Sequence, residues 1–196
     1  MMMKKVFSLI CVLLVAAISL NAQGQNQVGS IIKGADGKPA GIVFHYDEAT
    51  ATGLMVSLVD TVLPWGDSGV NIELAKDYIN SEVASHDFDG LINTAAIVTK
   101  FGKKTNYAAR WCFELTAGRL SGWYLPSSGE LNILLAKRQI INKALVDAKQ
   151  KPLTPTWHWT SSEGDANLAW SLLFSGGDNY PQDKNSPRIV RAIRKF

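Results

Sequence analysis

Cysteine is scarce in this chain of 196 residues, which contains only Cys11 and Cys112. Cys11 lies inside an apolar leader, so removal of the leader would leave a single thiol and exclude an internal disulfide. Stability must then come from packing. Ala108, Cys112 and Leu115 have helical spacing within residues 107–115, and this spacing predicts a buried, unreactive thiol.

Charge of one sign is also lacking, because 20 basic residues are balanced by 17 acidic ones. The leader carries Lys4 and Lys5 and no acid, so its removal would lower the formal net charge from +3 to +1. Proteins that bind nucleic acid normally concentrate basic residues on one face. The near-neutral balance therefore predicts no nucleic-acid partner.

Long hydrophobic runs are absent after the leader. Residues 1–5 carry the two lysines, residues 6–20 are apolar, and Ala22 offers a small residue for cleavage. Fifteen apolar residues fall short of the roughly 20 that span a bilayer. We therefore predict a signal peptide over residues 1–22 and an exported protein, in the periplasm, at the cell surface or secreted, without stable membrane insertion. Cys11 lies mid-run, which does not fit lipidation.

Motifs that carry catalysis are missing as well. The chain has no phosphate-binding loop, no HExxH and no serine nucleophile elbow. His158 stands between Trp157 and Trp159, where strand alternation predicts a solvent-facing side chain. We expect no enzyme and no cofactor. A hydrolase would require His158, Glu163 and Asp165 to converge in a cleft.

Asp87 and Asp89, followed by Asn93, have the spacing of the start of a calcium loop. The acid that would close such a loop is absent. We therefore predict no metal and interpret these residues as a turn and a helix cap.

Periodicity predicts strands towards both ends of the mature chain and helices between them. Residues 34–39 form a turn that two strands should flank. Leu91, Ala95 and Val98 are expected on the buried face of one helix, and Ser127 with Glu130 forms a capping box before another. We expect strands at residues 41–46, 54–59, 156–160, 168–174 and 189–196, and helices at residues 71–79, 91–101, 107–115 and after Ser127.

Residues 175–187 are polar and contain two glycines and two prolines, and we expect an unusually long loop there. One exposed aromatic among adaptable polar side chains is typical of a binding surface, although an ordinary solvated loop has a similar composition. The candidate ligand-binding residues come from this region and from the preceding residues 164–167. They are Asp165, Asn167, Asp178, Asn179, Tyr180, Gln182, Lys184 and Asn185.

The order of several short motifs carries a further signal. They are DFDGLINT at 87–94, ARWC at 109–112, GWYLPS at 122–127, ELN at 130–132, WTSSE at 159–163, AW at 169–170 and VRAIR at 190–194. With residues 23–40 as a lead-in and first turn, the domain over residues 41–196 resembles the bacterial family named after the C-terminal domain of the Legionella collagen-like protein.

This resemblance implies a C-type-lectin-like α+β fold, as in the variable proteins of diversity-generating retroelements and the formylglycine-generating enzymes. Such folds have mixed or antiparallel sheets, paired first and last strands, two or more helices and long irregular loops. The residues that match the structural framework are Trp123, Leu125, Pro126, Trp159, Ser161, Ser162, Glu163, Trp170, Arg191 and Arg194.

The chain departs from these relatives in two respects. It lacks the Glu-Pro-Asn or Gln-Pro-Asp and Trp-Asn-Asp motifs of calcium-dependent lectins, and it lacks the cysteine pair of the formylglycine-generating enzymes. We therefore predict a non-enzymatic, metal-independent module that recognises an unknown extracellular protein or glycan through its C-terminal loops. The alternative is a structural or assembly subunit of a cell-envelope or surface-appendage complex, which an exposed apolar patch near Leu63 or Trp65 would favour.

Overall fold

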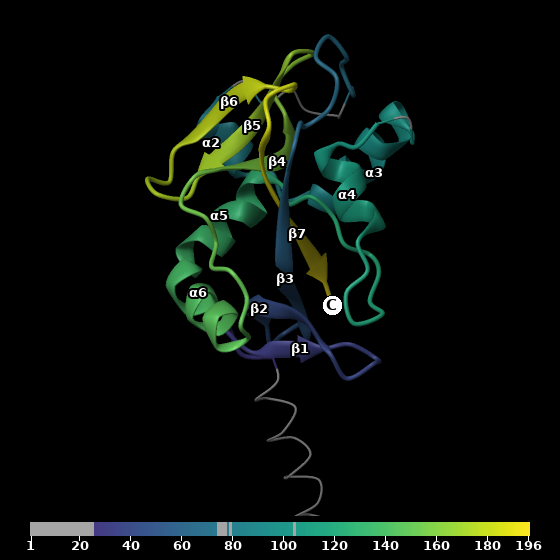
Figure 1. The fold of residues 1–196 in the computed structure, drawn as a ribbon. Helices are drawn as coiled ribbons and strands as arrows, with labels where there is room; N and C mark the ends of the chain where they lie inside the picture. Colours follow the sequence, from purple (N-terminus) through teal and green to yellow (C-terminus); the bar gives the residue numbers. More distant parts are fainter. Residues whose placement is uncertain (1–25, 74–77, 79, 104) are drawn as a thin grey trace, which may run out of the picture.

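The computed structural model describes residues 26–73, 78, 80–103 and 105–196. The predicted signal peptide lies outside these residues. Within them, one mixed sheet of seven strands has the order β1-β2-β3-β7-β4-β5-β6 (Figure 1). The strands are β1 (Ile31–Lys33), β2 (Pro39–Asp47), β3 (Thr52–Leu63), β4 (Trp157–Glu163), β5 (Leu168–Leu173), β6 (Asn179–Asp183) and β7 (Arg188–Lys195).

The N-terminal part of the sheet is antiparallel and built from local hairpins. Strands β1 and β2 flank the predicted turn at residues 34–39, which confirms it. Strands β2 and β3 pair from Asp47↔Thr52 inward, and the Asp47 carboxylate accepts from the Ala49 backbone N–H at 2.9 Å inside their turn. The residues that the sequence assigned to a lead-in therefore supply the edge strand β1.

The C-terminal strand β7 lies inside the sheet. It pairs antiparallel with β3, from Leu54↔Lys195 to Leu63↔Arg188, and parallel with β4 at His158↔Ile189. The expected pairing of first and last strands is wrong, because β1 is at the sheet edge and pairs with β2. The middle of β7, from Val190 to Ile193, is buried, and the buried Arg191 donates to the Ser57 carbonyl and to Asp60 of β3.

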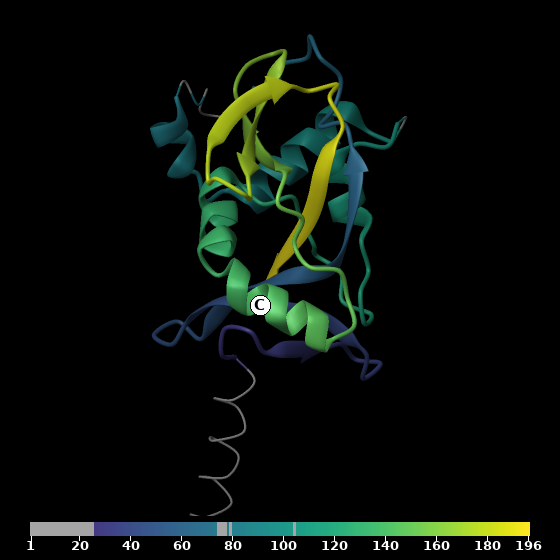
Figure 2. The same cartoon turned by 60° about the vertical axis from the view of Figure 1, so that its left-hand side comes forward.

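Helices cover both faces of the sheet (Figures 1 and 2). Helices α5 and α6 lie on one side, and α3 and α4 lie on the other. None of the helices in the described ranges is long and apolar enough to span a membrane. The helices of the described ranges are α2 (Ser81–Ser85), α3 (Gly90–Phe101), α4 (Ala108–Glu114), α5 (Ser128–Ala136) and α6 (Arg138–Asp147).

Each side of the sheet has its own hydrophobic core. Ile97, Tyr107 and Cys112 of the α3–α4 side pack with three buried tryptophans, whereas Leu131 and Ile141 pack with the opposite face. The α+β class and the mixed sheet that the sequence predicted are thus confirmed. The tryptophans of the first core are Trp65, Trp123 and Trp159.

The predicted helix over residues 91–101 is confirmed, but its buried face is not the one expected. Leu91 and Ala95 are exposed, whereas Asn93 and Thr94 are buried. The polar side chains can be buried because each has a hydrogen-bond partner, Asp87 for Asn93 and the Leu125 backbone for Thr94.

The helix expected over residues 71–79 is not found in its described part. Residues 71–73 have no helical structure, and residues 74–77 and 79 lie outside the described ranges. A short helix, α2, follows, with Asn80 as its N-cap. The Asn80 side chain accepts from the Val83 backbone N–H at 2.9 Å, which is the contact that starts the helix there.

The prediction of a long loop over residues 175–187 is wrong, because this segment contains strand β6. β6 pairs with β5 from Leu168↔Asp183 to Leu172↔Asn179. Periodicity missed it because a five-residue edge strand with polar side chains and Pro181 lacks apolar alternation.

Candidate functional site

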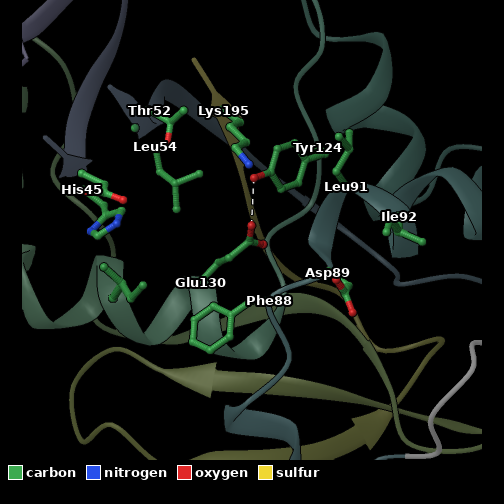
Figure 3. Close-up of a pocket in the computed structure, with 13 residues that line it drawn as sticks. His45, Thr52, Leu54, Phe88, Asp89, Leu91, Ile92, Tyr124, Glu130 and Lys195 are labelled. Atoms are coloured by element: carbon green, nitrogen blue, oxygen red, sulfur yellow. Dashed lines mark hydrogen bonds between the residues drawn. The ribbon is translucent and has the colours of Figure 1, made fainter. Parts of the chain in front are cut away.

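A hollow of about 490 Å³ opens where one end of the sheet meets α3 and α5 (Figure 3). Strands β2 and β3, the start of α3, the segment before α5 and the end of β7 all contribute to its wall. The lining residues are His45, Asp47, Thr52, Gly53, Leu54, Phe88, Asp89, Leu91, Ile92, Tyr124, Glu130, Ile133 and Lys195.

Glu130 is the buried polar group of this hollow. Its Oε1 accepts a hydrogen bond from the Tyr124 hydroxyl at 2.8 Å (Figure 3). Its Oε2 lies 2.9 Å from the backbone nitrogen and 3.0 Å from the hydroxyl of Ser127. The predicted capping box at the start of α5 is therefore confirmed, and it is what holds the carboxyl group in place.

Burial dominates the electrostatics of this carboxyl group. Desolvation raises the pKa of Glu130 to about 7, against the lowering effect of its hydrogen bonds from Ser127 and Tyr124. Burial, followed by the Glu130 charge, also raises the pKa of the Tyr124 phenol. The pair therefore remains Tyr–OH with a carboxyl group that is only partly ionised at neutral pH.

Three large apolar side chains stand exposed beside the hollow, and we call them the Phe88 surface. Phe88 is 54% exposed, Leu91 51% and Ile92 67%. Phe88 precedes α3, which begins at Gly90, and Leu91 and Ile92 lie in its first turn. Their packing against the core is prevented because Asn93, Thr94 and Ile97 occupy the buried face of α3.

The turn and helix cap predicted at Asp87 and Asp89 are confirmed in part. The buried Asp87 carboxylate accepts from Asn93 Nδ2 at 2.8 Å, from Ser162 Oγ at 2.6 Å and from the Asp89 backbone N–H at 2.9 Å. Asp89 is the N-cap of α3 but makes no capping hydrogen bond with its side chain. Across the described ranges, no group of three or more His, Cys, Asp or Glu side chains has metal-binding geometry.

A second hollow, of about 550 Å³, brings together three of the predicted ligand-binding residues. Asp178, Asn179 and Tyr180 line it, and the Tyr180 side chain is 63% exposed. In the described part of the chain, the buried amide of Asn179 has no hydrogen-bond partner. The remaining lining residues are Ser81, Ser85, Trp157 and Gly177.

The other predicted ligand-binding residues do not join this hollow. Asn167 and Asn185 both accept from Ser68, at 3.1 and 3.4 Å. Asp165 caps the backbone N–H groups of Asn167 and Leu168, and Gln182 accepts from Arg188. These contacts tie neighbouring loops together.

Lys184 does not have the predicted ligand-binding role, because its side chain is fully buried. Its ammonium donates to Glu163, to the Val70 carbonyl at 2.7 Å and to the Ala166 carbonyl at 3.1 Å. It also lies 4.7 Å from the centre of the Trp65 ring. Burial lowers the pKa of Lys184, while Glu163 opposes that shift.

The residues assigned to the framework lie in or beside the core. Each tryptophan indole donates to a backbone carbonyl, Trp123 to Leu120, Trp159 to Leu63 and Trp170 to Tyr78. Glu163 accepts from the Ile72 backbone N–H, and Ser128 N–H donates to Ser162. Arg194 is partly exposed, and the other nine framework residues are buried. The buried ones are Trp123, Leu125, Pro126, Trp159, Ser161, Ser162, Glu163, Trp170 and Arg191.

One further expectation is wrong. His158 does not face solvent: its ring is buried, stacks on Phe174 at 4.0 Å between ring centres, and its Nδ1 lies 2.9 Å from the Thr156 carbonyl. Burial lowers the pKa of His158 to about 4. Of the two residues whose exposure would favour the assembly alternative, Trp65 is fully buried and donates to the Thr160 carbonyl, whereas Leu63 is partly buried beside Val62, which is 55% exposed.

Sequence reasoning did not select Tyr124, Phe88 or Ile92 as site residues, and treated Glu130 only as a cap. One signal was present: Phe88, Leu91 and Ile92 have the i, i+3, i+4 spacing of one helix face, whereas Ile97 falls on the opposite face, so burial of Ile97 leaves the other three exposed.

No protein-family model matches the chain, and no curated protein matches its sequence. The resemblance to the Legionella collagen-like family stays a prediction. Among solved structures, a fimbrial protein from Bacteroides ovatus superposes with a TM-score of 0.62 and 18% sequence identity, covering 85% of this chain and 48% of that one. The chain thus spans about half the length of the fimbrial protein. At this identity the comparison establishes a shared fold: an α+β architecture that a fimbrial protein also uses.

Proposed function

We propose that this protein is a structural or assembly subunit of a surface appendage. The likeness to a fimbrial protein over 85% of this chain supports the proposal, as does the sequence prediction of export. The observation that carries it is the Phe88 surface, because exposed aromatic and aliphatic side chains next to a hollow are what a protein partner covers.

The composition of this surface fits a subunit contact. Phe88 and Leu91 supply apolar area beside the hollow, while Asp89 and Lys195 place charges around it. An apolar centre with a polar rim is the usual anatomy of a protein interface. An aromatic side chain at the centre is the kind of residue whose removal costs most of the binding energy.

The test is incorporation into appendages on the surface of the native host. A tagged chain with Phe88→Ser and Ile92→Ser should be exported and folded but absent from isolated appendages. The matched control changes Phe113→Ser and Val146→Ser, which are exposed to a similar extent, 52% and 58%, on other helices. Equal incorporation of the two double variants, or absence of the unchanged protein from the appendages, would contradict the proposal.

A second candidate, recognition of an extracellular protein or glycan, is favoured by the hollow at Tyr180. The exposed phenol ring and the unpartnered Asn179 amide offer the stacking and hydrogen bonds that such recognition uses. Binding to a panel of glycans, glycosaminoglycans and matrix proteins should be insensitive to EDTA and lost in the Tyr180→Ala, Asn179→Ala double variant at unchanged melting temperature. A blank panel would remove this candidate.

A further inference from the structure

We infer that the hollow at Glu130 binds a lysine side chain of a partner subunit, with the ammonium on Glu130 and Tyr124 and the aliphatic stem along the apolar wall. This inference rests on the proposed function, because it names the chemistry of the partner that covers the Phe88 surface. It depends on the acceptors, walls and charge of the hollow.

The acceptors are incompletely used. A carboxylate offers about four lone-pair directions on two oxygens. The Ser127 backbone N–H donates to Oε2, and Gly90 lies so close to this oxygen that a Cβ there would be 2.1 Å away. The Ser127 hydroxyl lies nearer to the Asp87 carbonyl, at 2.7 Å, than to Oε2. Among the described residues, Oε1 accepts from the Tyr124 hydroxyl alone. Oε1 therefore keeps a free lone pair, and the phenol oxygen, which donates its proton, keeps its own.

The walls fit an aliphatic stem. Leu54, Leu91 and Ile133 line the hollow with the Phe88 ring (Figure 3). A lysine buries its four methylene groups along such surfaces while its ammonium seeks acceptors. A ring face near the ammonium adds a cation–π attraction.

The charge of the lining favours a cation. Three carboxyl groups, those of Asp47, Asp89 and Glu130, line the hollow together with two basic side chains, Lys195 and His45. Threonine contacts and the Ala49 N–H lower the pKa of Asp47, so its charge is present at neutral pH. A desolvated carboxyl group such as Glu130 gains most from an opposite charge, because the hollow already excludes much of the water that would screen the pair.

The same geometry favours lysine over arginine. A guanidinium reaches its full strength through two parallel hydrogen bonds to both oxygens of one carboxylate. The Ser127 N–H and the close backbone of Gly90 cover Oε2, so Oε1 is the oxygen left open to the hollow. A compact ammonium, which needs single acceptors from different groups, matches Glu130 Oε1 and the Tyr124 oxygen.

Three probes that differ only in the side-chain end test this inference on the purified chain: the N-acetyl N-methylamides of lysine, norleucine and arginine, titrated at low salt by amide NMR. We expect saturable shifts at Gly90, Leu91 and Glu130 with the lysine probe. The norleucine probe should bind at least about tenfold more weakly, since it lacks the charged hydrogen bonds.

Glu130→Gln should weaken lysine binding by about tenfold or more while keeping the capping box, which accepts glutamine at this position. Glu48→Gln, the same change at an exposed position of the β2–β3 turn, should leave it unchanged. Equal binding of norleucine or arginine, an unaffected Glu130→Gln variant, or no saturable lysine binding at all would overturn the inference. Appendage incorporation is measured separately, so each hypothesis can fail alone.

Discussion

At the scale of single residues, the amino-acid composition does not show which charged side chains are buried. Lys184 uses its three ammonium donors on Glu163 and two backbone carbonyls, and it lies over the Trp65 ring. The loops that carry Val70 and Ala166 are thereby joined to the strand that carries Glu163. A buried pair of this kind is costly to break from one side, because the remaining ion is left without a partner.

Replacing Lys184 by Met should lower the free energy of unfolding by about 3 kcal/mol, since the buried Glu163 carboxylate would lose the charge that Lys184 provides. Adding Glu163→Gln should recover part of the loss, because a neutral amide can still accept from Ile72. Urea unfolding followed by circular dichroism measures both changes. The exposed pair of Lys143 and Asp147 supplies the control: Lys143→Met should cost less than about 1 kcal/mol. A Lys184→Met loss no larger than the control's would contradict the role of the pair.

Gly90 is the second residue whose role only contacts explain. A Cβ there would lie 2.1 Å from Glu130 Oε2 and 2.8 Å from the Ser127 nitrogen. Gly90→Ala should therefore lower the free energy of unfolding by about 1–3 kcal/mol, although alanine favours helices.

Thermal unfolding tests this, with Gly176→Ala as the control, because its Cβ would meet the movable end of Asp178 at 2.8 Å and Leu173 at an ordinary contact distance of 3.6 Å. A Gly90→Ala variant as stable as the control would mean that Glu130 is not held as tightly as the capping box implies.

At the scale of elements, β6 is the edge strand at the end of the sheet opposite β1. Two backbone hydrogen bonds show which facing residues of β5 and β6 form hydrogen-bonded pairs. They run from the Leu173 N–H to the Asp178 carbonyl and from the Lys184 N–H to the Asn167 carbonyl. Alternation between them places Tyr180 and Gln182 in hydrogen-bonded pairs and turns the backbone of Asn179, Pro181 and Asp183 outwards. Pro181 removes one outward N–H, a common protection against edge-to-edge pairing.

Pro181→Thr should restore that outward N–H and increase self-association, while the monomer unfolds at nearly the same temperature. Light scattering coupled to gel filtration, across a range of concentrations, measures the change. Pro187→Thr, in the exposed turn before β7, is the matched control. An unchanged monomer in both variants would show that the β6 edge is protected by something other than Pro181.

At the scale of the whole molecule, two buried groups oppose each other in the response to pH. The raised pKa of Glu130, about 7, means that the folded protein holds an extra proton between about pH 4.5 and 7, so this group lowers stability as pH rises. The lowered pKa of His158, about 4, means that the unfolded chain holds the extra proton between about pH 4 and 6.5, so this group raises stability as pH rises.

These two contributions should nearly cancel between pH 4.5 and 6.5 in the unchanged protein. Glu130→Gln removes the falling contribution, so its free energy of unfolding should gain up to about 3 kcal/mol relative to the unchanged protein as pH rises from 4.5 to 7. Urea unfolding at half-unit pH intervals measures the difference. Parallel profiles for the two proteins would contradict a raised Glu130 pKa.

The fold could be predicted from sequence where a segment's own pattern decided it. The capping box at Ser127 and Glu130, the hairpin at β2 and β3 and the helix α4 depend on neighbours in the chain, and all three were found. The predicted binding region was only partly assembled. Asp178, Asn179 and Tyr180 share a hollow, whereas Lys184 is buried, because the polarity of a residue does not reveal whether a distant partner will bury it.

The sequence by itself determined the α+β class, most of the helices and hairpins, and the burial of the Cys112 thiol, because periodicity, capping and composition act over a few neighbouring residues. Tertiary structure alone decided the central position of β7, the burial of His158 and Lys184, and the hollow around Glu130. Each of these joins segments tens of residues apart, as when Lys184 meets Val70 across 114 positions. Such contacts depend on which surfaces pack together, and no local pattern in the chain encodes that choice on its own.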